Sequence, residues 1–140
     1  MTAFDELKHK LAEDPSSFVV ILGAGVSIPA GIPSWSGLRN KLCEVLPDIY
    51  QDPVELTEVQ QYIENSRDLW AAFSRLRIKL GRARYEKGIV SALNPPNVEP
   101  PRLYKQIWQL NVSGIINFNL DKLALHYATR SYESTISNKT

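Results

Sequence analysis

The sequence is poor in cysteine and has no excess of charge of either sign. Cys43 is the single cysteine among 140 residues, which excludes a disulfide or a cysteine metal site within this chain. The formal net charge is +1, so nothing in the overall charge indicates binding to nucleic acid or to an anionic membrane. Some basic residues do cluster, and the solvated face of a helix explains them best; they are Arg75, Arg77, Lys79, Arg82, Arg84 and Lys87.

Long apolar runs are also absent. The opening segment MTAFDELKHKLAED is charged and amphipathic, unlike a signal peptide, and no apolar run approaches the length of a transmembrane helix. The apolar fraction of 44% and the charged fraction of 22% are ordinary for a globular domain. Together with the lone cysteine, these features predict a cytoplasmic protein that is not associated with a membrane.

Two apolar segments have the pattern of strands in a parallel sheet. Residues 18–22 form an unbroken apolar run, which predicts an interior strand covered on both faces, and residues 114–116 begin a second strand. The segment NPPNVEPP, residues 94–101, predicts a stiff connector without regular structure. Apolar spacing predicts helices around residues 4–11, 38–46, 56–63, 69–80, 103–110 and 123–127.

This alternation of strands and helices predicts an α/β layered fold. About ninety residues of mostly helical pattern separate the two strands, which is far longer than an ordinary crossover. The simplest explanation is a helical subdomain, at about residues 47–94, inserted into a Rossmann-like parallel sheet that binds a nucleotide. Because two strands do not close a core, we expect residues 1–140 to be the N-terminal part of such a domain, with its sheet incomplete in this chain.

A glycine-rich segment, GAGVSIPAGIPSW, follows the first strand directly at residues 23–35. Behind a parallel strand, Gly23 permits a sharp turn, and Gly25 lets backbone amides approach a pyrophosphate without a Cβ in the way. Ser27 can add a hydroxyl donor. The dinucleotide fingerprint has a third glycine where this chain has Ile28, so a plain strand-to-helix turn stays open as an alternative.

Two motifs at the predicted strand ends resemble those of the sirtuin family. The order GAGVS, then Gly31-Ile32-Pro33, then Trp35 resembles the cofactor-binding loop of that family. The segment 117–121, Asn-Phe-Asn-Leu-Asp, is similar to the family's Thr-Gln-Asn-Ile-Asp or Thr-Thr-Asn-Tyr-Asp, but departs from it at its first two positions. The helix before this segment also resembles the family's, with Tyr104 where histidine is usual.

The residues after Gly-Ile-Pro indicate which branch of the family the chain resembles. Deacetylating sirtuins usually continue with Asp-Phe-Arg, whereas this chain has Ser34, Trp35 and Ser36. This form is similar to the bacterial sirtuin-like group that hydrolyses NAD in anti-phage defence. The resemblance therefore implies an NAD glycohydrolase that releases nicotinamide and acts as a defence effector. It also implies a homo-oligomer, a C-terminal or separate sensor partner, or both.

The resemblance also implies roles for individual residues, with NAD as substrate and no metal ligand. Asn119 is the implied catalytic residue, because its amide would orient a ribose hydroxyl or the attacking water. Asp121 would accept a hydrogen bond from the nicotinamide carboxamide. The other implied cofactor-binding residues are Gly23, Ala24, Gly25 and Ser27 at the phosphates, Ile32 and Pro33 at the nicotinamide, and Trp35.

Other functions and simpler roles stay open at this point. The chain could hold NAD or ADP-ribose as a signal without cleaving it, or it could be an NAD-dependent protein deacylase. Asn119 and Asp121 could cap a helix that starts near Leu120, and Ser27 could be an N-cap as well. Trp35 could serve only in packing.

The sequence predicts that residues 1–140 alone release no nicotinamide from NAD. The family's acid/base histidine belongs to a His-Gly pair a few tens of residues beyond the second motif, and this chain has no such pair. His126 lies on a predicted helix, where a surface or packing role is the simpler explanation. Loss of a positioned acid/base group costs about 10²–10⁴ in rate. A fluorescent NAD-analogue assay measures the release, and robust turnover that is lost in His126→Ala would contradict the prediction.

Overall fold

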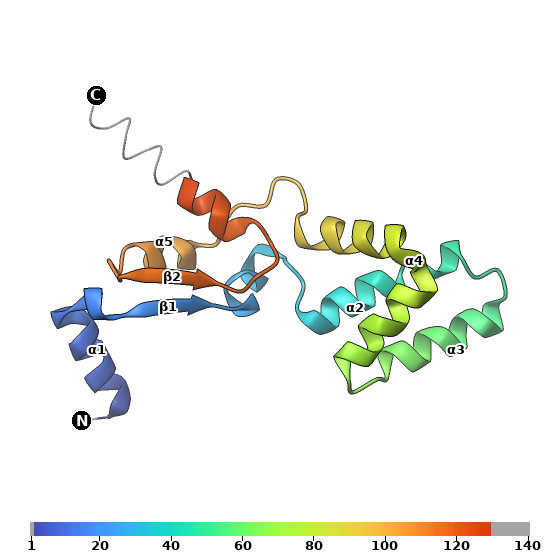
Figure 1. The fold of residues 1–140 in the computed structure, drawn as a ribbon, viewed down its shortest axis with the longest axis horizontal. Helices are drawn as coiled ribbons and strands as arrows, with labels where there is room; N and C mark the ends of the chain where they lie inside the picture. Colours follow the sequence, from blue (N-terminus) through green and yellow to red (C-terminus); the bar gives the residue numbers. More distant parts are fainter. Residues whose placement is uncertain (1, 130–140) are drawn as a thin grey trace. The chain divides into compact units, whose positions relative to one another are not determined.

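The computed structural model describes residues 2–129 and divides into two compact units. The first unit comprises residues 2–31 and 98–129, and the second comprises Ile32–Asn97 (Figure 1). The chain is mostly helical, with one small parallel sheet. The prediction of a fold that combines helices with a parallel sheet is therefore confirmed.

The sheet of the first unit consists of two parallel strands that lie far apart in the sequence. Strand β1 (Val19–Leu22) pairs with β2 (Gly114–Asn117), so that Val19 is opposite Gly114 and Leu22 is opposite Asn117. Both predicted strands are confirmed. Because the strands are parallel and in register, the loops that follow them leave the sheet at the same end (Figure 1).

One face of this sheet is exposed. Val19, Ile21 and Ile116 are 53%, 65% and 47% exposed, and Ile21 pairs directly with Ile116. The prediction that both faces of the first strand are covered is therefore wrong for the described residues. Helix α1 (Ala3–Glu13) does not cover this face, since it contributes no buried residue and its Phe4 and Leu7 are 67% and 49% exposed.

The buried apolar side chains of the first unit come from three elements. Strand β1 contributes Leu22, α5 (Arg102–Trp108) contributes Tyr104 and Ile107, and residues 123–129, which are helical, contribute Leu123 and Ala124. Residues 94–101 contain no helix or strand, as predicted for the proline-rich connector. The first unit therefore packs α5 and the helical segment 123–129 around one end of a two-stranded sheet.

The second unit is built from three helices. They are α2 (Trp35–Cys43), α3 (Pro53–Glu64) and α4 (Leu69–Leu93). The short 3-10 turn η4 (Leu46–Asp48) also contributes to the buried core of the unit, which includes Leu38, Leu42, Leu46, Ile63, Leu76 and Leu80. The helix predicted around residues 69–80 is broken at Gly81, which has a φ of 72° and a ψ of 158°, and a second helical stretch that was not predicted follows it to Leu93. The predicted insertion at about 47–94 lies inside this unit, which also includes α2.

Cys43 lies in the core of this helical unit and is 2% exposed, as expected for a small apolar residue. Burial, with a further contribution from the negative charge of Glu64, raises the pKa of its thiol to about 11. The thiol is therefore protonated at neutral pH and is a poor nucleophile.

None of the helices within residues 2–129 has the length and apolar character needed to cross a membrane.

Close packing of α2 on α4 predicts that Gly88→Ala destabilises the helical unit. A Cβ at residue 88 would lie 2.6 Å from Cδ2 of Leu42, a side chain that is 1% exposed. We expect the free energy of unfolding to fall by about 1–3 kcal/mol, the usual cost of overpacking a core. Thermal denaturation measures this change, with Ser91→Ala at an exposed position of the same helix as the control. Equal melting temperatures for the two variants would contradict the close packing.

Candidate functional site

The two motif loops lie side by side at the carboxyl ends of the parallel strands. The amide of Phe118 donates to the carbonyl of Leu22 at 3.1 Å, which continues the pairing of β1 and β2 into the loops. In open α/β sheets, ligands bind at this end of the strands. The structure therefore brings the glycine loop and the 117–121 segment together.

The glycine loop consists of two short 3-10 turns, η2 (Ala24–Val26) and η3 (Ile28–Ala30). The second turn ends at Gly31, which has a φ of 84° and a ψ of 6°. This left-handed conformation is costly for any residue with a Cβ, so the fold itself requires the glycine at position 31.

Gly23 and Gly25 are different from Gly31. Gly23 has an extended conformation, with a φ of −117°, and Gly25 does not have a positive φ. A Cβ added at either position would meet no atom within 4 Å outside the neighbouring residues. Neither backbone strain nor packing therefore explains glycine at these two positions.

Asn119 joins the two loops through its side-chain amide. Its Nδ2 donates to the carbonyl of Gly23 at 3.1 Å and to Oγ of Ser27 at 3.3 Å, and its backbone amide donates to Oδ1 of Asn117 at 3.1 Å. A helix cap would instead accept a hydrogen bond from a helix amide. The side chain of Asn119 thus connects loops and is not a cap.

Ser27 and Tyr104 form the buried part of the same network. Both residues are 0% exposed, and Oγ of Ser27 lies 3.0 Å from the hydroxyl of Tyr104. Burial is the largest effect and raises the pKa of Tyr104. The hydrogen bond with Ser27 lowers this pKa by a smaller amount, and the charge of Asp121 raises it by less still. The Tyr104 hydroxyl is therefore protonated and neutral around pH 7.

Asp121 has the geometry of a helix cap. It is 7% exposed, and its Oδ1 accepts from the backbone amide of Leu123 at 3.0 Å, at the start of the helical residues 123–129. The proposed interpretation of Asp121 as a cap is therefore confirmed, and this contact occupies one carboxylate oxygen. His126, on the same helical segment, is exposed, as expected for a surface histidine.

The remaining residues that the sequence indicates belong to the helical unit. Ile32 is 5% exposed, and the ring of Trp35 meets Phe73 edge to face at 5.9 Å. Trp35 and Phe73, together with Leu69 and Trp70, line a small apolar cavity of about 130 Å³. Trp35 is nonetheless 49% exposed, so packing accounts for only part of its surface.

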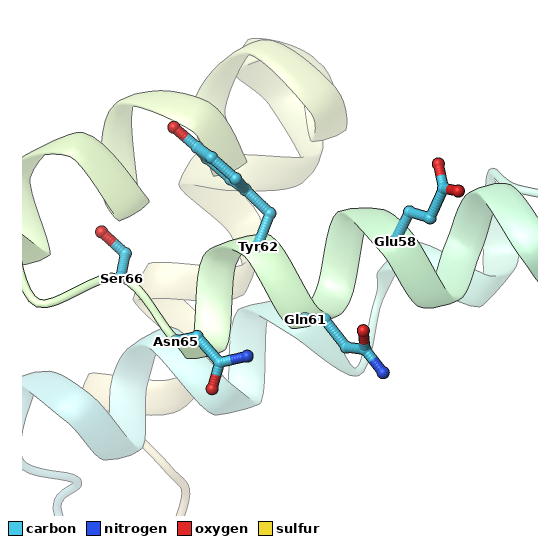
Figure 2. A pocket seen from close by; sticks show the side chains of 5 residues that line it. All are labelled: Glu58, Gln61, Tyr62, Asn65 and Ser66. Atoms are coloured by element: carbon cyan, nitrogen blue, oxygen red, sulfur yellow. The ribbon is translucent and has the colours of Figure 1, made fainter.

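A second hollow of about 480 Å³ lies on α3 and is lined by Glu58, Gln61, Tyr62, Asn65 and Ser66. Figure 2 shows that Gln61 and Asn65 point away from Tyr62, so the polar groups do not converge. The ring of Tyr62 packs under the guanidinium of Arg75 at 5.3 Å. This hollow therefore has no arrangement of groups that would hold a defined ligand.

Within residues 2–129 no group of three or more His, Cys, Asp or Glu could hold a metal ion.

Sequence reasoning assigned no site role to Tyr104, although the structure places its hydroxyl in the centre of the network. The one signal in the sequence was its position in the helix before the second strand, where the resembled family has a polar histidine.

Comparisons with protein-family models, with curated proteins and with solved structures find no match for this chain.

The cap at Asp121 predicts different effects of two substitutions on the stability of the fold. Asp121→Ala removes the acceptor of the Leu123 amide, and we expect it to lower the free energy of unfolding by about 1 kcal/mol. Asp121→Asn keeps an acceptor oxygen, and asparagine caps about as well as aspartate. Chemical denaturation followed by circular dichroism compares the two variants. Equal stability of Asp121→Ala and the wild type would contradict the capping role.

Proposed function

We propose that the first unit is the NAD-binding part of a Rossmann-like, sirtuin-like domain, and that the full-length protein is an NAD glycohydrolase. The observation that carries the proposal is the unexplained pair of glycines. Gly23 and Gly25 stand at the carboxyl end of β1 with no positive φ and no close neighbour. Space reserved for a bound group accounts for glycine at both positions.

The hydrogen bonds of the loop are consistent with a phosphate site. The turn at residues 24–26 uses the amides of Val26 and Ser27, which donate to the carbonyls of Gly23 and Ala24 at 3.1 and 3.0 Å. The amides of Ala24 and Gly25 come before these and take no part in the bonds of the turn. Two successive amides with no Cβ at Gly25 suit the close approach of a pyrophosphate.

The proposed reaction is the hydrolysis of the bond between nicotinamide and ribose. The bond from the nicotinamide nitrogen to the anomeric carbon breaks, and its electron pair stays on nicotinamide. The oxygen of water bonds to the anomeric carbon and loses a proton, so NAD and water yield nicotinamide, ADP-ribose and a proton. Residues that position this water, or the ribose, lower the barrier by orienting the reactants.

Residues of both motifs have roles in this proposal. Ala24 and Ser27 belong to the phosphate loop, and Asn119 acts at the reacting ribose. Asp121 accepts from the nicotinamide carboxamide, for which its second carboxylate oxygen would serve. The resemblance assigns Ile32, Pro33 and Trp35 a contact with the nicotinamide, which stays a prediction from the sequence.

We infer further that the protein acts in the cytoplasm as a defence effector. It would work as a homo-oligomer, with a C-terminal or separate sensor partner, or with both. Binding of NAD without cleavage is the alternative function, and the same loop geometry favours it. Release of nicotinamide by the full-length protein separates these two functions, because a sensor binds NAD and leaves it intact.

The proposal predicts that Gly25→Val abolishes NAD binding and leaves the fold intact. A Cβ at residue 25 meets no atom within 4 Å outside the neighbouring residues, so we expect the free energy of unfolding to change by less than about 0.5 kcal/mol. The valine side chain would occupy the space of the pyrophosphate. Isothermal calorimetry with NAD and thermal denaturation measure the two effects.

Gly31→Ala is the matched contrast for this prediction. Its left-handed conformation should lower the free energy of unfolding by about 1–2 kcal/mol. The two variants thus separate a glycine that the ligand requires from one that the fold requires. Unchanged NAD affinity in Gly25→Val would contradict the phosphate-binding role of the loop.

A further inference from the structure

We infer that Asn119 acts through its Oδ1 atom, and that Tyr104, through Ser27, is the positioning residue that holds this atom toward the ligand. The inference rests on the proposed function and deepens it, because it names the atom that acts at the reacting ribose. It follows from the hydrogen bonds around the Asn119 amide.

The orientation of the amide is determined by its neighbours. The carbonyl of Gly23 can only accept a hydrogen bond, so the side chain of Asn119 must turn Nδ2 toward it. The second hydrogen of Nδ2 goes to Oγ of Ser27 at 3.3 Å. Both hydrogens of the amide are thereby used inside the protein, and Asn119 has no donor left for a ligand.

Oδ1 of Asn119 is the atom of the side-chain amide that can still bind a ligand. No hydrogen bond from the described residues reaches it, yet no fully buried side-chain nitrogen or oxygen in the described part of the chain lacks a partner. Oδ1 must therefore be accessible from outside the protein. It lies at the carboxyl end of the two strands, next to the glycine loop, and it can accept a hydrogen bond from an O–H group. A ribose hydroxyl and the attacking water are both O–H donors.

Tyr104 is the member of the network whose position is held by packing. Its ring is 0% exposed and contacts Trp108 and Tyr127, with ring centroids 5.9 and 6.2 Å away. Its hydroxyl lies 3.0 Å from Oγ of Ser27, which in turn accepts from Asn119. Since α5 and its aromatic contacts hold the ring, the Tyr104 hydroxyl limits the positions that Ser27, and hence Asn119, can adopt.

The test compares Tyr104→Phe with Tyr127→Phe in the full-length protein. Each variant removes one hydroxyl from the same aromatic cluster, but the hydroxyl of Tyr127 makes no hydrogen bond within residues 2–129. We expect Tyr104→Phe to lower kcat for nicotinamide release by about 10-fold or more, with the Kd of NAD changed by less than about twofold. Tyr127→Phe should match the wild type. Equal kcat values for the two variants, or a raised Kd with unchanged kcat in Tyr104→Phe, would overturn the positioning role.

Substitutions of Asn119 itself test which atom acts. Asn119→Ala should keep NAD binding and lose nicotinamide release. Asn119→Asp keeps an acceptor oxygen but loses both N–H donors, and it turns a carboxylate toward the Gly23 carbonyl. If the orientation of the amide holds Oδ1 in place, Asn119→Asp should be as inactive as Asn119→Ala. Release at the wild-type rate by Asn119→Asp would overturn the inference.

A measurement without NAD keeps the inference testable if a variant is unstable. Nuclear magnetic resonance with 15N-labelled asparagine should show slow hydrogen exchange of the Asn119 side-chain amide in the wild type, and faster exchange in Ser27→Ala. Fast exchange in a wild type that releases nicotinamide would overturn the positioning alone. A wild type that neither binds NAD nor releases nicotinamide would overturn the proposed function, and with it the catalytic role of Oδ1.

Discussion

The parallel pairing of Val19–Leu22 with Gly114–Asn117 is the constraint on which the candidate site depends. Ninety-six positions separate Gly23 from Asn119, and only this pairing brings the loops that carry them to one edge. The amide of Ser113 donates to the carbonyl of Phe18, and that of Phe118 to the carbonyl of Leu22, so hydrogen bonds extend past both ends of the strands. A slip of one residue would move Asn119 away from the Gly23 carbonyl and break the contact between the loops.

Buried hydrogen bonds hold the loops more precisely than the sheet alone could. Ser27 and Tyr104 are both fully buried, and an unpaired hydroxyl in such a place would cost about 1–3 kcal/mol. The two hydroxyls share one hydrogen bond at 3.0 Å, and Asn119 donates a second one to Ser27 at 3.3 Å. The cost of leaving any of these groups unpaired favours one arrangement of the loops, which is what a site for a defined ligand requires.

The fold requires one of the three glycines of the loop, and the proposal explains the other two by a bound ligand. Gly31 has a left-handed backbone that is costly for a residue with a Cβ, whereas Gly23 and Gly25 have no positive φ and have open space around them. The proposal of a dinucleotide site rests on this contrast. The apolar side chains of Val19, Ile21 and Ile116 on the open sheet face have no such explanation within the described residues.

The sequence by itself determined the elements and their order. Apolar runs indicated both strands, helical spacing indicated the helices, and the proline-rich segment marked a boundary, because these signals depend on near neighbours in the chain. Sequence patterns did not predict that one face of the sheet is open or that α4 continues past Gly81. Burial and helix packing depend on residues that are far away in the sequence. The roles left open for Asn119 and Asp121 were separated by the structure. Asp121 caps the helical residues 123–129 through a local contact, whereas Asn119 makes tertiary contacts and donates to Gly23 and Ser27. Tyr104 belongs to the site because of a tertiary contact as well. A hydroxyl 77 positions from Ser27 becomes its partner only when α5 folds against the loop, and no local pattern of residues encodes that contact.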